Sequence, residues 1–241
     1  MKSNKFLIVL SLLVISLVTL IFIPASMAIA DGKIGVIVVD VQGDFTTWKN
    51  GSLAVKGTDK AFIDKVRKAT ETLSREGYLI FATQDWHPAD HISFYTNHPG
   101  KKAYDVIKIE GRTQVLWPPH CVQGTENARV LVDNNLFLAI VHKGGDKRYD
   151  SYSGFMDDVG QKTEMDQMLK RNGIQKLIVY GIATDYCVKC TAIDAAKLGF
   201  KVTVVKDLCR GVDPKTSKKA IQDMTASGVK VVEKLDDVQL K

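Results

Sequence analysis

Short apolar runs alternate with segments of helical periodicity along most of the chain, and this alternation restricts the fold more than any other feature. The apolar runs are typical of strands buried on both faces and occupy residues 34–39, 78–83, 136–141, 177–180, 201–205 and 229–232. Helical spacing occurs over residues 58–76, 163–172 and about 186–198, and Asp213-Pro214 begins a further helix. This order predicts an α/β fold with a doubly wound, mainly parallel six-stranded sheet and helices on both faces.

The segment 84–135 interrupts this alternation. It contains most of the prolines and is too long for a plain connection between a strand and a helix. We therefore expect a functional loop that contains short elements of its own.

Residues 1–30 have the layout of a secretory signal peptide. Lys2 and Lys5 form a basic start, residues 6–23 are almost wholly apolar, and Ala28-Ile29-Ala30 is a small-x-small cleavage site. We expect export, to the periplasm if the source is a diderm bacterium, and a single mature domain over residues 31–241. About 20 apolar residues can span a bilayer, so an uncleaved membrane anchor stays open as the alternative.

The charge of the chain gives no support to nucleic-acid binding. The formal net charge is +6, and it falls to +4 when the two lysines of residues 1–30 are removed, because that segment has no acids. Basic and acidic residues are interspersed, and no basic block with interleaved aromatics occurs. We therefore expect a small-molecule partner and no nucleic acid, and the sequence leaves a homo-oligomer open.

Cys187 lies at the point where an apolar strand gives way to a helix. The first turn of a helix carries unpaired N–H groups and the positive end of the helix dipole, which favour a thiolate and can bind an oxyanion. A buried structural cysteine is the alternative, since free cysteine is among the most buried residue types. Cys190 completes a CxxC, but a second CxxC and a Trp-Cys-Gly context are absent, which disfavours a zinc ribbon or a thioredoxin-like site.

Three further reactive residues follow predicted strands. Asp40, Asp85 and Lys143 come at or just after strand ends, and the carboxyl ends of parallel strands meet at one edge of the sheet. A carboxylate beside a cysteine can take and return its proton, and a lysine keeps that carboxylate ionised and lowers the pKa of the thiol. This grouping predicts hydrolysis through Cys187, with Asp40 and Lys143 as its partners.

A second cluster has the composition of a metal site. Asp85 and His87 are two residues apart at a strand end and so point the same way, and His120 follows a rigid Trp-Pro-Pro sequence. Two imidazoles and a carboxylate suit one divalent ion, with Zn²⁺ preferred and Fe²⁺ or Mn²⁺ open. His91 is either a fourth ligand or a residue that supports the ligands.

Aromatic residues provide a candidate wall for a flat ring. Phe45, Trp86, Phe94, Trp117 and Tyr152 surround the reactive residues in the sequence, although core packing is the alternative for each of them. We expect the substrate to lie against Phe45, Trp117 and Tyr152, and against Ile182 as well.

Five motifs together resemble one family. Residues 38–45 (VVDVQGDF), 84–88 (QDWHP), 117–121 (WPPHC), 142–144 (HKG) and 181–188 (GIATDYCV) look like the isochorismatase-like cysteine hydrolases, and within them the nicotinamidases, also called pyrazinamidases. The resemblance covers nearly all of residues 35–213. It implies the three-layer isochorismatase-like fold.

The resemblance also implies roles for these residues. Cys187 would be the nucleophile, Asp40 the proton carrier and Lys143 the third member of a triad. Asp85, His87 and His120, and in some relatives the equivalent of His91, would hold a metal that binds the pyridine nitrogen of nicotinamide. A cis peptide before Ala183 would let the N–H groups of Ala183 and Cys187 form an oxyanion hole.

The expected reaction is therefore hydrolysis of nicotinamide to nicotinate and ammonia through a thioester, and of pyrazinamide by the same route. A related cysteine hydrolase acting on another small amide or an isochorismate-like substrate is the alternative, and a metal-storing or redox-responsive binding protein is the non-enzymatic one. Two features depart from the family. Cys190 offers a disulfide partner that would silence Cys187, and an export segment is unusual for an enzyme of NAD salvage.

Overall fold

The computed structural model describes residues 32–240. The predicted leader, residues 1–30, lies outside the described residues. Six parallel strands form one sheet in the order β5-β2-β1-β6-β7-β8. They are β1 (Lys33–Val39), β2 (Leu79–Asp85), β5 (Ala139–Lys143), β6 (Ile174–Ile182), β7 (Lys201–Arg210) and β8 (Lys230–Val232).

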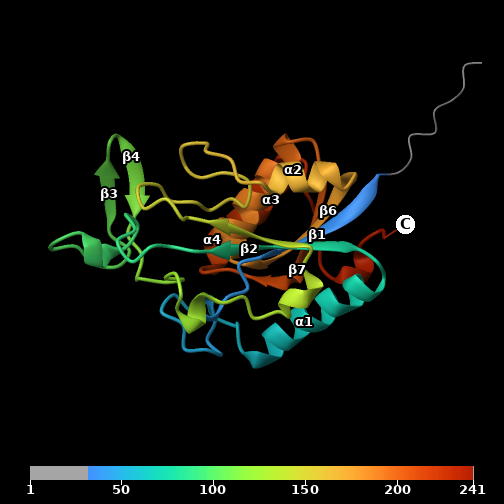
Figure 1. The fold of residues 1–241 in the computed structure, drawn as a ribbon, viewed down its shortest axis with the longest axis horizontal. Coiled ribbons are helices and arrows are strands. Elements are labelled where there is room, and N and C mark those ends of the chain that lie inside the picture. The colour runs from blue at the N-terminus through green and yellow to red at the C-terminus, as the bar shows by residue number, and fades with distance from the viewer. Residues whose placement is uncertain (1–31, 241) are drawn as a thin grey trace, which may run out of the picture. The chain divides into compact units, whose positions relative to one another are not determined.

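Helices cover both faces of this sheet. The helices are α1 (Lys60–Arg75), α2 (Met165–Arg171), α3 (Lys189–Lys197) and α4 (Pro214–Ala226). α1 lies on one side of the sheet, and α2 and α3 lie on the other (Figure 1). The central strands are buried on both faces, as their apolar sequences require, and residues 36–39 of β1 have no exposed surface. The predicted doubly wound architecture is confirmed.

Local sequence explains where the helices begin. The carboxylate of Asp59 accepts the N–H of Phe62 at the start of α1. Asp213 accepts the N–H groups of Lys215 and Thr216 and precedes Pro214, as the Asp-Pro pair predicted for α4.

Two strands are longer than their apolar runs. β6 begins at Ile174 and ends at Ile182, beyond the predicted residues 177–180, and β7 runs on from Val205 to Arg210. A register shift between Val179 and Gly181 lets the polar end of β7 pair with the end of β6. The apolar runs do not predict these extensions, because the end of a strand at the margin of the sheet can carry polar side chains.

The third predicted strand begins later than expected. Residues 134–136 form a 3-10 turn, in which the carboxylate of Asp133 accepts the N–H of Asn135, and β5 starts only at Ala139. The prediction of 136–141 was therefore displaced by the length of this turn, although it placed Lys143 correctly near the strand end.

The long segment after β2 contains an antiparallel hairpin, β3 (Val106–Ile109) and β4 (Arg112–Val115). The hairpin stands apart from the main sheet (Figure 1). Its two-residue turn, Glu110-Gly111, has φ of 50° and 79°, the left-handed conformations that such a turn requires. Glutamate at the first position is not a strong turn signal, so the sequence predicted short elements here without their type.

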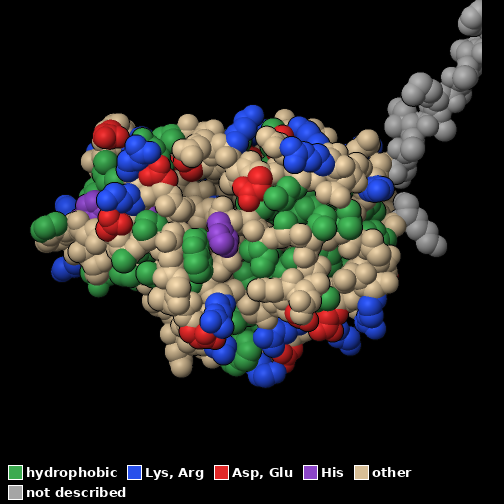
Figure 2. All heavy atoms as spheres, viewed as in Figure 1, with side chains coloured by type: hydrophobic (Ala, Val, Ile, Leu, Met, Phe, Trp, Pro, Cys, Tyr) green, Lys and Arg blue, Asp and Glu red, His purple; other side chains and the backbone are tan. Residues whose placement is uncertain are grey.

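Basic and acidic side chains are interspersed over the face drawn in Figure 2, so neither sign dominates that face. Among residues 32–240, no helix has the length and apolar character needed to cross a bilayer.

Candidate active site

The carboxyl edge of the sheet brings the predicted reactive residues together. Asp40 follows β1, Asp85 and Lys143 are the last residues of β2 and β5, and Cys187 follows the end of β6. The parallel register sets Asp85 directly beside Lys143. Parallel strands that end side by side thus deliver four chemically distinct groups to one place, the usual location of sites in this architecture.

The ammonium of Lys143 contacts both predicted clusters. Its Nζ lies 3.0 Å from Oδ2 of Asp40 and forms a second ion pair with Oδ1 of Asp85. It also donates to the carbonyl oxygen of Ser151 at 2.9 Å and to Sγ of Cys187 at 3.5 Å. Only 2% of Lys143 is exposed, so its partners are the protein groups around it. One buried cation therefore joins the sulfur of Cys187, the carboxylate of Asp40 and that of Asp85, a metal-ligand candidate.

Asp40 is held by hydrogen bonds that leave one oxygen available. Its φ of 48° is a left-handed conformation that aspartate tolerates better than most residues. Oδ1 accepts the hydroxyl of Thr83 at 2.6 Å. Oδ2 makes the ion pair with Lys143 but, among the described residues, no hydrogen bond of good geometry. Oδ2 is thus the oxygen positioned to take a proton.

Burial dominates the titration of these groups. It raises the pKa of the Cys187 thiol well above its usual value, and the ammonium of Lys143 offsets this only in part. Burial also raises the pKa of Asp40, again against the lowering by Lys143. Burial disfavours charged Lys143, but Asp40 and Asp85 outweigh it and raise the pKa of the ammonium well above its usual value.

This titration differs from the sequence-based expectation of a thiolate. The helix end and Lys143 were expected to lower the pKa of Cys187, whereas the depth of burial, which the sequence does not report, raises it. Burial therefore favours the thiol form, whose proton has to leave during attack. Asp40 is the acceptor within reach, since a carboxylate oxygen of Asp40 and Sγ of Cys187 lie within 4.8 Å of each other.

Asp85, His87 and His120 form a buried group that could hold a metal ion. Their ligand atoms lie within 4.8 Å of one another. Nε2 of His87 is 3.6 Å and Nε2 of His120 is 3.9 Å from Oδ2 of Asp85. Nδ1 of His87 faces the carbonyl oxygen of Gly144 at 2.9 Å, and Nδ1 of His120 faces that of Pro118 at 2.8 Å. Both Nδ1 atoms must therefore carry hydrogen, which leaves the Nε2 lone pairs aimed at the shared space.

Gly144 is required for this arrangement. Its φ is +66°, and a Cβ at this position would lie 2.3 Å from Cε1 of His87. A side chain at this position would collide with the imidazole of His87 and displace it from the observed position.

His91 lies beside this group but is engaged by the protein. Its Nε2 faces the carbonyl oxygen of Tyr149 at 3.1 Å, and its Nδ1 lies 2.8 Å from the hydroxyl of Ser93. Its ring packs against that of His87, with centroids 4.3 Å apart. Because both ring nitrogens have protein partners, His91 lies outside the grouped ligand atoms of Asp85, His87 and His120, and its role at the metal site stays a prediction.

Asp44 fixes the segment that carries His120. Its Oδ2 accepts the N–H of Cys121 at 2.7 Å, and its Oδ1 accepts the hydroxyl of Ser52 at 3.2 Å. The Ser52 hydroxyl also lies 2.6 Å from the carbonyl oxygen of Pro119. The sequence analysis included Asp44 in a motif and gave it no role. The one indication in the sequence was that this acidic residue lies close to Asp40.

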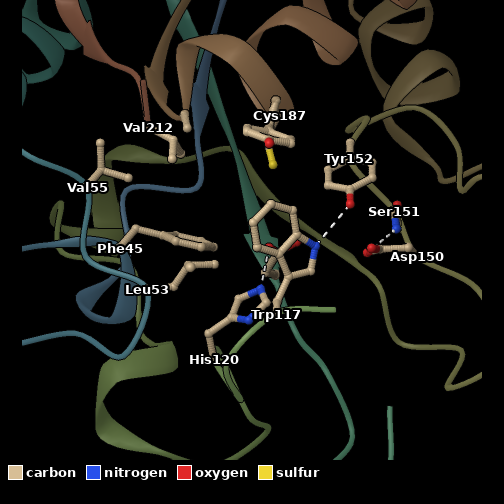
Figure 3. Close-up of a pocket in the computed structure, with 13 residues that line it drawn as sticks. Phe45, Leu53, Val55, Trp117, His120, Asp150, Ser151, Tyr152, Cys187 and Val212 are labelled. Atoms are coloured by element: carbon tan, nitrogen blue, oxygen red, sulfur yellow. Dashed lines mark hydrogen bonds and ion pairs between the residues drawn. The ribbon is translucent and has the colours of Figure 1, made fainter. Parts of the chain in front are cut away.

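A pocket with about 440 Å³ of empty space opens at the Cys187 sulfur (Figure 3). It is lined by Phe45, Leu53, Val55, Asp85, Trp117, His120, Asp150, Ser151, Tyr152, Ala183, Tyr186, Cys187 and Val212. Figure 3 shows the thiol pointing toward the ring of Trp117. Aromatic and aliphatic walls with few polar groups suit a small, flat ring.

Cys187 projects from a tight turn at the end of β6. Residues 184–188 form one turn of π-helix, in which the N–H of Val188 donates to the carbonyl of Ala183 at 3.1 Å. The peptide bond between Ile182 and Ala183 is cis, as the resemblance implied. Ala183 and Cys187 both line the pocket, and the oxyanion hole formed by their N–H groups stays a prediction.

Residues 35–235 match the model of the isochorismatase domain. The chain belongs to the isochorismatase family. Over 197 residues it is 42% identical to a nicotinamidase of Escherichia coli, across 80% of this chain and 91% of that protein. The yeast nicotinamidase bound to the inhibitor nicotinaldehyde is 32% identical with a TM-score of 0.77, covering 83% of this chain and 100% of that one.

A third relative is the pyrazinamidase of Pyrococcus horikoshii in complex with zinc. It is 34% identical to this isochorismatase-family chain, with a TM-score of 0.70, and covers 83% of this chain and 98% of that one. These proteins align over nearly the whole described domain. The predicted family and fold are therefore confirmed.

Within this isochorismatase-family pocket, the predicted aromatic wall is largely present. Phe45, Trp117 and Tyr152 line it, whereas Ile182 does not and is packed into the core with no exposed surface. Ile182 is the last residue of β6, and its side chain packs into the core. Its position just before Ala183 in the sequence does not show which way the side chain points.

The two other aromatic candidates lie outside the pocket lining. The ring of Trp86 stacks on that of His142. Phe94 is fully buried and packs edge-on against His87 and at a tilt against His91. Phe94 thus supports the imidazoles rather than the space beside Cys187.

Sequence reasoning missed part of the pocket. The additional lining residues are Leu53, Val55, Asp150, Ser151, Tyr186 and Val212. Each comes from a loop or turn, where no periodicity reports which side chains face inward; only Tyr186 had a signal, because it precedes Cys187.

Asp185 was also missed. Its carboxylate accepts the N–H of Val212 at 3.0 Å, the N–H of Asp213 at 3.2 Å and the hydroxyl of Thr216. These bonds tie the Cys187 turn to the start of α4 and hold Val212 at the pocket. All four cysteines are free thiols, so a bond from Cys187 to Cys190 stays a prediction.

Proposed function

We propose that this protein hydrolyses nicotinamide to nicotinate and ammonia through a thioester, and that it accepts pyrazinamide by the same chemistry. The observation that carries the proposal is the position of one pocket. It lies between the Cys187 sulfur, with Asp40 and Lys143 behind it, and the group of Asp85, His87 and His120. A carboxamide and a ring nitrogen on one small aromatic ring would meet both groups at once.

The first half-reaction uses Asp40 as a proton carrier. Asp40 takes the proton of the Cys187 thiol, and Sγ attacks the carboxamide carbon. The oxygen of the resulting tetrahedral adduct accepts hydrogen bonds from the backbone N–H groups of Ala183 and Cys187. Asp40 then gives the proton to the departing nitrogen, the C–N bond breaks, and ammonia leaves a thioester on Cys187.

The second half-reaction reverses these roles. Asp40 removes a proton from a water molecule, which attacks the thioester carbon. The C–S bond breaks, the product leaves as nicotinic acid, which ionises to nicotinate in solution, and the proton on Asp40 returns to Cys187. Lys143 keeps the carboxylate and the developing thiolate next to a positive charge throughout, which lowers the energy of both anionic forms.

Asp85, His87 and His120 would hold one divalent cation, and we propose Zn²⁺, with Fe²⁺ and Mn²⁺ open. The residues fit the ion, because both Nε2 lone pairs and Oδ2 of Asp85 face the same space and the Nδ1–H groups are anchored to carbonyl oxygens. When bound, the ion would attract the pyridine nitrogen and so orient the carboxamide toward Cys187. Burial lowers the pKa of His120 to about 4, which keeps this imidazole neutral and able to bind a cation. At His87, burial is outweighed by Asp85, which raises the pKa, so the proton on its Nε2 would leave when a cation binds.

Ammonia release from nicotinamide tests the proposal. The Cys187→Ala variant should keep the circular dichroism spectrum of the parent and lose ammonia release. The control variant is Lys147→Met, which removes an exposed ion pair and should keep full activity. Asp185→Ala would not serve as a control, because Asp185 holds the turn that carries Cys187. Appreciable turnover by Cys187→Ala, or a parent that prefers an aliphatic amide over nicotinamide, would contradict the proposal.

We propose further that the protein is exported and acts on nicotinamide outside the cytoplasm. The basic start, the apolar stretch and the small-x-small site in residues 1–30 support this location. Cleavage before Asp31 would release the domain; an uncleaved leader would leave it at the membrane.

A further inference from the structure

The hairpin formed by β3 and β4 has little core of its own. The residues of β3 alternate between exposed and half-buried, and Gln114 is the one residue of β4 that is buried. Isolated two-stranded hairpins are marginally stable in water. The hairpin therefore depends on contacts with the domain, and Gln114 makes a polar one.

Gln114 reaches a carboxylate at the pocket. Its Nε2 donates to Oδ2 of Asp150 at 2.9 Å and to the carbonyl oxygen of Val115 at 2.8 Å, so both amide hydrogens are used. Asp150 is 4% exposed, and its Oδ1 accepts the N–H of Ser151 at 2.9 Å. The carboxylate lines the pocket, so the hairpin contacts the substrate space through it.

Tyr152 connects this group of polar side chains to the aromatic wall of the pocket. Nε1 of Trp117 donates to the hydroxyl oxygen of Tyr152 at 3.0 Å, a bond drawn in Figure 3. Burial and the nearby carboxylate of Asp150 raise the pKa of this hydroxyl well above its usual value. A buried polar cluster of Gln114, Asp150, Tyr152 and Trp117 thus lies between the hairpin and the aromatic wall.

A second contact joins the same two parts. The ring of Tyr104, next to the hairpin, meets the ring of Trp117 edge to face with centroids 6.0 Å apart. The N–H of Leu116, which follows β4, donates to the carbonyl oxygen of Asp105 at 2.8 Å. Trp117 therefore follows the hairpin in the chain and is held by it through side chains as well.

We propose that this hairpin is a specificity element, in which Gln114 and Asp150 are positioning residues that hold Trp117 against the ring of the substrate. The proposal rests on the proposed function, since it assigns the wall to an aromatic carboxamide. Movement of the hairpin would shift the wall while leaving Cys187 and Asp40 in place. It predicts an effect on substrate binding without one on the chemical step.

The test compares Gln114→Leu, Tyr152→Phe and their double variant in steady-state hydrolysis of nicotinamide. Gln114→Leu removes the bond to Asp150 and Tyr152→Phe removes the bond from Trp117, and for each we expect KM to rise about tenfold, with kcat within about twofold of the parent. Because both residues hold Trp117 through the same cluster, the double variant should raise KM no further than the stronger single variant. Thr113→Val, on the exposed face of the same strand, is the matched control and should leave both constants unchanged.

A second measurement is independent of activity. In a Trp48→Phe, Trp86→Phe background, Trp117 is the remaining tryptophan. Acrylamide should quench its fluorescence more strongly when Gln114→Leu is added to this background than when Gln114 is kept. The proposal would be overturned if the quenching did not change, if the KM increases of the two single variants multiplied in the double variant, or if kcat alone fell. If the parent does not hydrolyse nicotinamide, the proposed function fails, while the quenching comparison still decides the role of the hairpin.

Discussion

Replacing Lys143 by methionine removes the buried charge on which the site depends, with little change in side-chain length. The ammonium pairs with Asp40 and Asp85 and lies 3.5 Å from Sγ of Cys187. Removing one partner of a buried ion pair costs about 3–5 kcal/mol, because the remaining charge has no compensation. For a domain of this size each kcal/mol corresponds to about 2–4 °C, so we expect the melting temperature of Lys143→Met to fall by roughly 6–20 °C.

The size of this loss should depend on pH. The charge of Lys143 lowers the pKa of Asp40, which burial otherwise raises above the usual value of 3.8, so the variant raises it further. A group whose folded-state pKa is raised binds more protons folded than unfolded, and the stability of the variant therefore falls as pH rises through that pKa. The deficit relative to the parent should be smaller at acidic pH, where a carboxylate left without Lys143 can take up a proton, and should grow toward pH 8.

The measurement is urea unfolding, followed by circular dichroism, of both proteins after chelation, at a series of pH values. Lys147→Met is the matched control, because Lys147 forms an exposed ion pair with Asp90 and its removal should change nothing measurable. Ammonia release by Lys143→Met should be lost as well, but a lost activity alone has many causes. A deficit of equal size at pH 4 and pH 8, or no deficit, would refute the assignment of Lys143 as the compensating charge.

Three other changes have defined outcomes. Thr83→Val removes the hydroxyl that donates to Oδ1 of Asp40, a bond to a charged group worth about 1.5–3 kcal/mol. The acid limb of the pH profile of kcat/KM should therefore move up by about one to two pH units, and an unmoved limb would exclude Asp40 as the group that titrates. His120→Ala should weaken metal binding at least about tenfold in competition with a chromophoric chelator, whereas His91→Asn should weaken it less, and equal losses would show that His91 is a ligand. Mass spectrometry of the exported protein should find Asp31 at its amino terminus, and an intact Met1 in the membrane fraction would favour the anchor instead.

The fold was predictable because its signal is repeated. Each strand of the sheet is an apolar run, and each helix between strands has one apolar face, so an error in one element does not alter the architecture. Element ends were less predictable. The extension of β7 beyond Val205 and the turn at residues 134–136 depend on pairing and capping that become visible only in three dimensions.

The reactive residues were predictable for a different reason. Asp40, Asp85, Lys143 and Cys187 follow strands of one parallel sheet, and topology alone brings such residues to one edge. Their protonation was not predictable. The sequence suggested a thiolate at Cys187, but the pKa depends on how completely the sulfur is removed from water, and burial raises it. Similarly, loop residues such as Asp150 enter the pocket without any periodic signal.

The separation of the site into a catalytic cluster and a metal cluster was a consequence of reading along the chain. In the structure, Asp85 belongs to both, since its Oδ1 pairs with Lys143 and its Oδ2 faces the two imidazoles. A cation held by Oδ2 would draw negative charge away from Lys143, whose ammonium would then act more fully on Asp40. In the proposed mechanism, the charge beside the proton carrier Asp40 and the charge that would hold the metal ion therefore meet at the carboxylate of Asp85, and we expect a change at either cluster to affect the other.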